Sequence, residues 1–477
     1  MFTALLRLPI VSPAVLVPVD VVAGLLVLWV LVGRRRGVLA RATGLLAGAA
    51  LGLVVIWWLG DVRDEFGVDF TPVTRMWLTF ASGALGLCAV VAVQTLRSAQ
   101  SAQSAQSAQS AQSAQSAQSV RGRGFLSDAP EPRRAVRRRL STAIGATAVV
   151  ALAAGLGVNV DFGAYRTIGQ VVTTNPYPAG TLGHEHAVSA TPQTVDTAAW
   201  RAPAGMPRRG RTLSVRIPGT VSHFRARRAV VWLPPAALTT DPPTLPVLIA
   251  LSGQPGQPAD MFQSGDLGRT LGAYASAHRG LAPIVVAPDQ LGAPGRNPMC
   301  VDSRGLGRSA TYVMTDTVHW IRTHLDVAST PAGWGIAGFS EGATCAMQFS
   351  TGHPEVFGTA LAISSELAPR NGSEHHTVQV GFNGSEDAYR AAAPIATMHR
   401  HGPYRDHLTV FGFGQDDAPY RASTTALRAA AVRAGMQTAL VVSPGSAHDW
   451  NTVRYVLAHG LPPVLAHLGL PATAGPR

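Results

Sequence analysis

The first 160 residues gather their apolar positions into four long runs, at 14–33, 38–59, 76–96 and 141–160. Each run contains few charged residues and is close to the length of about 20 residues with which a helix crosses the hydrocarbon core of a bilayer. No run of comparable length follows the fourth. The pattern therefore predicts a membrane domain with four transmembrane helices over residues 1–162.

Two segments lack such a pattern. The segment 97–139 contains the triplet "SAQ" seven times, with a period of three that matches neither a helix nor a strand. Its small and polar side chains bury too little surface to offset the entropy of ordering them, so we expect a disordered loop there. The segment 163–210 is rich in Thr, Pro, Gly and Ala, and we expect it to be an extended linker.

From residue 211 onward, short apolar runs typical of buried strands alternate with helix-like segments. The strand-like runs include "PVLIALSG", "APIVVAPD", "GWGIAGFS" and "HLTVFGFG". This alternation is typical of an α/β fold with a mainly parallel sheet, whose active site lies at the carboxyl ends of the strands. We therefore expect one water-soluble α/β domain over residues 211–470.

Arginines cluster in two of the loops that join the apolar runs. "GRRRG" follows the first run, and "RRAVRRR" precedes the fourth, whereas the loop between the second and third runs is mostly acidic. Short cytoplasmic loops collect Lys and Arg, so both basic loops are expected in the cytoplasm. Both chain termini, and with them the α/β domain, are then extracytoplasmic.

The composition agrees with a membrane protein. Hydrophobic residues make up 47% and charged residues 14%, which is more apolar than an ordinary soluble protein. The net charge of +12 is concentrated in the loops assigned to the cytoplasm, where it orients the helices and contacts anionic lipid headgroups. The expected partner is therefore the lipid bilayer, and no nucleic-acid partner is expected.

The three cysteines fall into two groups. Cys88 lies in the third apolar run, whereas Cys300 and Cys345 lie in the exported domain, where a disulfide can persist. These two residues either form a disulfide or are two small buried hydrophobic side chains. The sequence leaves both interpretations open.

The segment "GFSEG" places Ser340 between Gly338 and Gly342. The pattern alone is weak, but a strand-like run precedes it and a helix-like run follows it. A sharp turn between a strand and a helix exposes the serine hydroxyl and leaves room only for small neighbours, which explains both glycines. At the start of the helix, the backbone N–H of Glu341 is expected to help stabilise an oxyanion.

A serine nucleophile needs an oriented base, and the chain offers one downstream. His448 lies in a loop after the last strand-like run, and Asp416 and Asp417 directly follow the strand-like run before it. A histidine that takes the serine proton requires an acid that holds its ring. The order Ser, Asp, His is the order that α/β hydrolases use. The predicted catalytic set is therefore Ser340, His448 and one of the two aspartates.

With these residues, the segment 211–468 resembles the esterase D-like branch of the α/β hydrolases, which includes S-formylglutathione hydrolases, enterochelin esterases and mycolyltransferases. The motifs that carry the resemblance are "LSGQ", "PMCVDS", "GFSEG" and "HDW". The resemblance implies that the N–H of Gln254 is the second oxyanion donor and that Asp417, rather than Asp416, is the acid of the triad. The chain departs from its relatives at Glu341, where an uncharged residue is common and a carboxylate would disfavour anionic substrates.

Two histidine pairs were considered as metal ligands. His184 and His186 lie in "GHEH", and His375 and His376 lie in "EHH", both in polar surroundings without a clear third ligand. Paired histidines in such segments are usually solvated, whereas a zinc site needs three or four ligands. We therefore expect neither a metal nor another cofactor.

Together these features predict a membrane-anchored, extracytoplasmic serine hydrolase that acts on an acyl-ester or glycolipid substrate through an acyl-enzyme. One alternative is an acyltransferase that passes the acyl group to a sugar or polyol hydroxyl, because the same triad supports both reactions. The other alternative is a non-catalytic binding module on a hydrolase fold.

Overall fold

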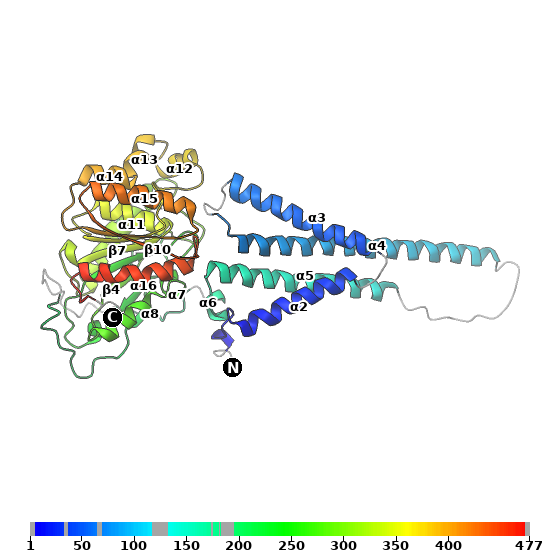
Figure 1. The fold of residues 1–477 in the computed structure, drawn as a ribbon, viewed down its shortest axis with the longest axis horizontal. Coiled ribbons are helices and arrows are strands. Elements are labelled where there is room, and N and C mark those ends of the chain that lie inside the picture. Colours follow the sequence, from blue (N-terminus) through cyan, green and yellow to red (C-terminus); the bar gives the residue numbers. More distant parts are fainter. Residues whose placement is uncertain are drawn as a thin grey trace. The chain divides into compact units, whose positions relative to one another are not determined.

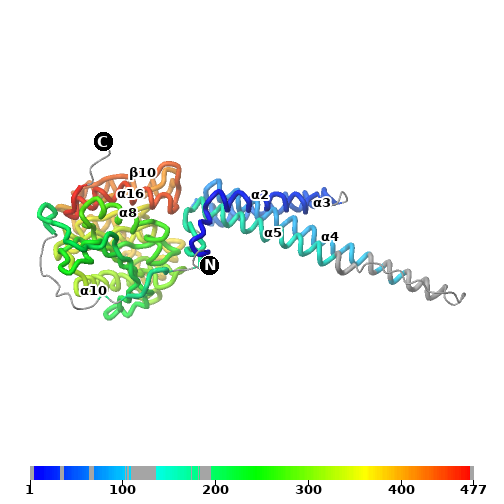
Figure 2. The backbone as a smooth tube through the Cα atoms, turned by 90° about the horizontal axis from the view of Figure 1, so that it is seen from below, coloured from blue at the N-terminus to red at the C-terminus, as the bar shows by residue number. Residues whose placement is uncertain are grey.

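The computed structural model describes residues 5–32, 37–63, 69–116, 132–172, 175–180, 182 and 195–472. The chain forms two compact units. One unit is Pro9–Asp161, and the other is Phe162–Arg477 together with Met1–Leu8. Figure 1 shows a helical unit and a unit built around a sheet, and Figure 2 traces the backbone of both; each unit is described separately below.

The helical unit contains the four predicted helices. They are α2 (Pro13–Val32), α3 (Val38–Ile56), which continues as a π-helical segment (Trp57–Val62), α4 (Pro72–Ser116) and α5 (Pro132–Phe162). Each contains a stretch that is long and apolar enough to cross a membrane, judged by length and composition. These stretches are Pro13–Val32, Val38–Val62, Pro72–Ser101 and Val136–Phe162.

Glycines allow α3 and α4 to pack closely. A Cβ atom added to Gly86 would lie 2.2 Å from the carbonyl oxygen of Gly44, and one added to Gly48 would lie 2.5 Å from the carbonyl oxygen of Ser82. Larger side chains at these positions would push the two backbones apart. Close packing through small residues is a common way for membrane helices to associate, because apolar burial provides little driving force in lipid.

The expected disorder over 97–139 is wrong for the described part of that segment. Helix α4 runs on through the SAQ triplets to Ser116, and α5 already begins at Pro132, while residues 117–131 lie outside the described residues. Ala and Gln are good helix formers, and extending a helix that already exists avoids the cost of nucleation. The Ser98 hydroxyl also donates to the Gln94 carbonyl at 2.8 Å, so the serines are accommodated within the helix.

The second unit contains an eight-stranded sheet, which confirms the predicted α/β-hydrolase fold. In spatial order the strands are β1 (Arg211–Val215), β2 (Ala229–Leu233), β4 (Ile284–Ala287), β3 (Val247–Leu251), β7 (Trp334–Phe339), β8 (Thr359–Ile363), β9 (Leu408–Gly414) and β10 (Gln437–Ser443). β2 pairs antiparallel with β1 and β4, and all other pairings are parallel.

Helices cover both faces of this sheet (Figure 1). Helices α11 (Glu341–Gly352), α14 (Pro394–His401) and α15 (Ala418–Arg433) lie on one face, and α8 (Leu267–Ala277) and α16 (Trp450–His467) lie on the other. The smaller helices are α6 (Ile168–Val172), α7 (Asp260–Gln263), α9 (Ser309–Thr311), α10 (Val318–His324), α12 (Glu374–Gly381) and α13 (Glu386–Ala392). Short 3-10 and π-helical segments (Pro235–Leu238, Tyr312–Thr317, Pro331–Gly333) and a two-stranded ribbon, β5 (Asp302–Ser303) with β6 (Gly307–Arg308), complete the unit.

Strand β7 lies at the centre of the core. All six of its residues are buried, as are all residues of β3, β8 and β9. These strands are parallel and covered on both faces, which explains why their sequences are continuous apolar runs rather than alternating ones. Because their carboxyl ends meet at one edge of the sheet, the loops that follow them come together there.

The segment 163–210, which the sequence predicts to be an extended linker, contacts the sheet unit through several of its described residues. Part of it is the short helix α6, and Gly180 donates its N–H to the Ser214 carbonyl at 3.0 Å beside β1. The Trp200 indole N–H donates to the Arg279 carbonyl at 3.0 Å, and its ring packs against the core. The apolar side chains in this segment therefore attach it to the sheet unit.

Candidate active site

Ser340 occupies a strained turn between β7 and α11. Its backbone has φ 57° and ψ −122°, in the region of positive φ that L-residues rarely adopt. The Ser340 N–H donates to the Ile363 carbonyl at 2.9 Å, and its carbonyl oxygen accepts from the N–H of Ala343. These hydrogen bonds hold the strained conformation, which is the kind of backbone strain that active sites concentrate.

The two glycines of the turn have no room for a side chain. A Cβ atom on Gly338 would lie 2.0 Å from the carbonyl oxygen of Gly342, and one on Gly342 would lie 2.3 Å from the carbonyl oxygen of Ser252. The clashing atoms are backbone atoms, which cannot rotate away. The predicted close approach of the backbone at both glycines is therefore present.

Replacing Gly338 by Ala is expected to destabilise the sheet unit by about 3 kcal/mol, because overpacking a core against backbone atoms forces the strand and helix apart. Gly352, at the end of α11, is the matched control, since a Cβ atom there meets nothing within 4 Å. We expect Gly352→Ala to change the unfolding free energy by less than about 1 kcal/mol. Chemical denaturation of the purified full chain measures both values, and equal effects would contradict the steric argument.

The structure brings Ser340, His448 and Asp417 together. His448 Nε2 lies 2.9 Å from Ser340 Oγ, and His448 Nδ1 lies 3.0 Å from Asp417 Oδ2. All three residues are buried, with exposures of 9%, 7% and 4% in the order Ser340, His448, Asp417. The imidazole thus lies between the hydroxyl and the carboxylate, with one ring nitrogen facing each.

Asp449 orders the loop that carries His448. One of its carboxylate oxygens accepts from the N–H of Ala447 at 2.8 Å, and the other accepts from the N–H of Thr452 at 2.8 Å. The second bond caps the N-terminus of α16. The backbone on both sides of His448 is therefore held by the residue that follows it.

Of the two adjacent aspartates, Asp417 contacts His448. Asp417 is buried at the N-cap position of α15, whereas Asp416 is exposed and donates its backbone N–H to the Ser446 carbonyl at 2.9 Å. The structure thus places the side chain of Asp417 against His448, and that of Asp416 at the surface.

Two residues near the triad were missed from the sequence. The Ser364 hydroxyl donates to Asp417 Oδ2 at 3.1 Å, from the loop directly after β8. The Tyr420 ring stacks on the imidazole of His448 with a centroid distance of 4.1 Å, and Phe339 stacks on the same imidazole at 4.8 Å. In the sequence, Ser364 is marked as a site residue by its place at the carboxyl end of a strand. Tyr420 is marked by its place one helical turn after Asp417.

Aromatic residues also limit the freedom of the imidazole. The Trp450 ring packs against the ring of Phe339 with a centroid distance of 5.2 Å, and so supports one of the rings that stack on His448. The Tyr420 phenol is buried, which raises its pKa, and the nearby carboxylate of Glu366 adds to that shift. Tyr420 therefore remains protonated over the whole working range and can act as a hydrogen-bond donor near Ser340.

The two expected oxyanion donors lie in neighbouring segments. Glu341 is the first residue of α11, and the first N–H groups of a helix have no partner within the helix. A Cβ atom on Gly253 would lie 3.3 Å from Cβ of Ser340, so the segment that leads to Gln254 passes beside the serine. The segments that carry Gln254 and Glu341 therefore both lie beside Ser340.

The Glu341 side chain differs from its expected setting. It is 5% exposed and points into the interior, where Oε1 lies 3.1 Å from Cys345 Sγ and Oε2 accepts from Gln290 Nε2 at 3.1 Å. Burial is the main cause that raises the pKa of this carboxyl to about 8, while the bond from Gln290 opposes the shift. An inward, uncharged side chain would repel anionic substrates less than an exposed carboxylate, and the expected effect on such substrates stays a prediction.

Cys300 and Cys345 form a disulfide, which links the loop before β5 to α11. Cys88 is free and lies in α4. Within the described ranges, Cys300, Glu341 and Cys345 are the one group of His, Cys, Asp or Glu residues that lie close enough to share a metal ion. Their sulfurs are joined to each other, which removes the thiolates that a metal would bind.

One of the two histidine pairs lies within the described residues. His375 and His376 are exposed on α12, a helix of the segment between β8 and β9. His184 and His186 lie outside the described residues.

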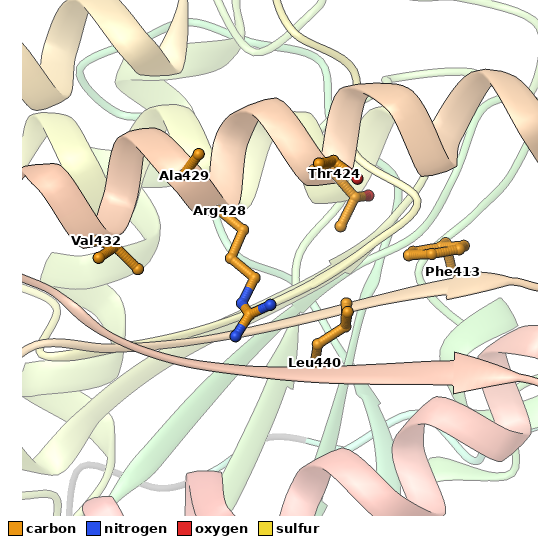
Figure 3. Close-up of a pocket in the computed structure, with 7 residues that line it drawn as sticks. Phe413, Thr424, Arg428, Ala429, Val432 and Leu440 are labelled. Atoms are coloured by element: carbon orange, nitrogen blue, oxygen red, sulfur yellow. The ribbon is translucent and has the colours of Figure 1, made fainter.

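A separate cavity of about 370 Å³ lies between α15 and strands β9 and β10. Figure 3 shows Arg428 extending from α15 toward Leu440 on β10, with Phe413 and Thr424 further along the cavity. No residue of the triad lines this cavity.

The mainly parallel sheet, its covering helices and the strained turn after a central strand define this unit as an α/β hydrolase domain. Residues 225–454 match the family model described as "Putative esterase". This part of the chain is therefore similar to the members of that esterase family.

The chain is similar to an uncharacterized protein of Corynebacterium glutamicum, with 35% identity over 239 residues, which are 50% of this chain and 54% of that protein. The chain thus spans about half the length of this curated relative. Among solved structures, a ferulic acid esterase has a TM-score of 0.46 and 17% identity, over 54% of this chain and 98% of that chain. An S-formylglutathione hydrolase from Agrobacterium tumefaciens has a TM-score of 0.44 and 19% identity, over 55% of this chain and 95% of that chain.

Proposed function

We propose that the protein is a membrane-anchored serine hydrolase that cleaves acyl esters through an acyl-enzyme. The observation that carries this proposal is the pair of contacts of His448, to Ser340 Oγ at 2.9 Å and to Asp417 Oδ2 at 3.0 Å. The match of residues 225–454 to the esterase family model supports the choice of an ester as substrate.

The reaction proceeds in two stages. His448 takes the hydroxyl proton as Ser340 Oγ attacks the ester carbonyl, and Asp417 orients the ring and stabilises its charged form. The backbone N–H groups of Gln254 and Glu341 stabilise the oxyanion. His448 then protonates the leaving alcohol, and the acyl group stays on Ser340. Water, activated by the same histidine, releases the acid and restores the serine.

The aromatic residues around the histidine assist both stages. Phe339 and Tyr420 hold the imidazole plane between them, so the ring keeps its position as its charge changes. Ser364 adds a hydrogen bond to the carboxylate of Asp417 and thereby limits its rotation. A rigid triad lowers the reorganisation needed to reach the transition state.

The four apolar helices support anchoring in the membrane, and the arginine-rich loops support a domain on the extracytoplasmic side. Protease treatment of intact spheroplasts tests this topology. We expect the α/β domain to be digested without lysis. Digestion that occurs only after lysis would place the domain in the cytoplasm and overturn this part of the proposal.

The reaction is tested with the full chain in detergent micelles and a chromogenic short-chain acyl ester. We expect release of the alcohol together with free acid. Addition of a polyol such as trehalose tests the acyl acceptor, because an acylated polyol in place of free acid would identify an acyltransferase. A folded protein that releases no alcohol and forms no acyl-enzyme would instead be a non-catalytic binding module.

A further inference from the structure

The carboxyl group of Glu341 lies in a closed environment behind the proposed oxyanion site. Its Oε1 atom lies 3.1 Å from Cys345 Sγ and 3.8 Å from Cys300 Sγ. Both sulfurs belong to the disulfide and carry no proton to donate. Oε2 accepts one hydrogen bond, from Gln290 Nε2 at 3.1 Å. The reaction described above uses only the backbone of this residue.

Gln290 connects Glu341 to the other oxyanion segment. Its Nε2 atom also donates to the Ser252 carbonyl at 2.7 Å, so its two amide protons serve Glu341 and Ser252. The backbone of Gln290 is itself fixed, because its carbonyl oxygen accepts from the Ser309 hydroxyl at 2.6 Å. Gln290 therefore bridges the first residue of α11 and a residue two positions before Gln254.

This bridge joins the two segments that carry the expected oxyanion donors. The first turn of α11 already approaches Ser252 so closely that Gly342 has no room for a Cβ atom. The disulfide holds the far side of the Glu341 carboxyl, since Cys345 lies one turn further along α11. The carboxyl is thus fixed from both sides, and with it the position of the Glu341 N–H relative to the Gln254 segment.

The charged groups around Glu341 favour its uncharged form. Asp289, from the loop after β4, and Glu366, from the loop after β8, are the acids that act on it. Asp289 forms an ion pair with Arg227, whose Nη2 lies 2.6 Å from Asp289 Oδ1. The Arg227 guanidinium is therefore paired with Asp289 rather than with Glu341. Burial and these acids raise the pKa of Glu341 to about 8. The side chain is therefore a neutral carboxylic acid at pH 7.

Ionisation of this side chain would act directly on the oxyanion. A carboxylate at Glu341 would place a buried negative charge on the residue whose N–H is expected to stabilise another negative charge. In a buried site such a repulsion is poorly screened by solvent. It would also change the hydrogen bond that Gln290 shares between Glu341 and Ser252.

We propose that Glu341 is a positioning residue: its uncharged carboxyl, bridged by Gln290 to Ser252, holds the two oxyanion amides together, and its ionisation stops hydrolysis. This inference rests on the proposed function of the Ser340 site. It assigns a role to the one residue of "GFSEG" whose side chain the triad mechanism leaves unused.

The test is the pH dependence of kcat for ester hydrolysis between pH 6 and pH 9.5. A triad alone predicts a rate that rises as the histidine loses its proton and then stays level. For the wild type we expect instead an alkaline fall, with kcat at pH 9 about tenfold below its value at pH 7, as a group titrating near pH 8 requires. In Glu341→Gln, which keeps the shape but cannot ionise, the ratio of these two rates is expected to return to near one.

Two further variants distinguish a positioning role of Glu341 from a general effect of removing a carboxylate. Gln290→Leu breaks the bridge, and we expect about a tenfold lower kcat with a smaller change in KM, because the oxyanion forms only in the transition state. Glu374→Gln makes the same chemical change on the exposed first turn of α12 and should keep the alkaline fall of the wild type. Loss of the alkaline fall in this control would overturn the assignment to Glu341.

Thermal unfolding gives a readout that does not depend on activity. The pKa of Glu341 is raised in the folded state, so stability is highest below the pKa of the unfolded chain and falls as pH rises toward about 8. Relative to Glu341→Gln, the wild type should therefore lose stability between pH 5 and pH 8. A constant difference over this range would contradict a buried neutral acid.

The outcomes distinguish this inference from the proposed function. A wild type that hydrolyses the ester, with an alkaline fall that persists in Glu341→Gln, overturns the inference alone. A wild-type kcat that stays level between pH 7 and pH 9 would also overturn the inference alone. A wild type that neither hydrolyses any ester nor reacts with a fluorophosphonate overturns the proposed function, and the inference with it.

Discussion

Replacing Ser340 by Ala is expected to lower kcat for ester hydrolysis by about a millionfold. Loss of the nucleophile alone removes the acyl-enzyme route, and effects of this size are known for serine triads whose serine is deleted. The Ser340 hydroxyl lies 2.9 Å from His448 Nε2, so it is well placed to lose its proton to this base. Steady-state rates on a chromogenic ester, with the full chain in detergent, give the value.

Covalent labelling provides a second measurement on the same variant. We expect a fluorophosphonate to label the wild type and to leave Ser340→Ala unlabelled. Ser329→Ala, on an exposed loop before β7, is the matched control and should keep both labelling and rate. Labelling that persists in Ser340→Ala would mean that another residue is the nucleophile.

The parts of the fold that follow from local patterns were predictable. Strand β7 was recognised because a parallel strand covered on both faces has to be apolar throughout. The turn at Ser340 was recognised because its geometry tolerates only small residues at Gly338 and Gly342, and the structure places backbone atoms where their side chains would be. Each of these constraints is expressed within a few neighbouring residues.

The SAQ segment shows the limit of pattern analysis. Its period of three gives no amphipathic face, which led to the expectation of disorder. Helix extension depends on what precedes a segment, and here the apolar part of α4 provides an existing helix. The expectation of disorder considered the SAQ residues alone and left out the helix that precedes them.

The site was predictable to the extent that its members lie at the ends of strands. Ser364 and Tyr420 were missed because their importance comes from contacts across loops, to Asp417 and to His448. For the same reason the sequence could not show that the Glu341 side chain turns inward. At the first position of a helix, the side chain points to the core or to solvent according to the loops packed against it, here those of Gln290 and Cys300.

Replacing Asp417 by Asn is expected to lower kcat by about 10⁴-fold, whereas the same change at Asp416 is expected to lower it by less than about threefold. An amide at position 417 donates to His448 Nδ1 in place of accepting from it, so the ring holds its proton on Nε2 and cannot take the proton of Ser340. Asp416 is exposed and contributes only its backbone to the site, so its side chain can lose its charge without changing the imidazole.

The adjacent aspartates make this pair a controlled experiment, because both variants carry the same chemical change in the same loop. kcat and KM on one ester should be measured for both, together with their unfolding free energies. A large loss of rate in Asp417→Asn at nearly unchanged stability and KM is the result expected of a residue that orients the base in the transition state. If Asp416→Asn lost the activity instead, the loop between β9 and α15 would have to rearrange in the working enzyme so that Asp416 replaces Asp417 at the histidine.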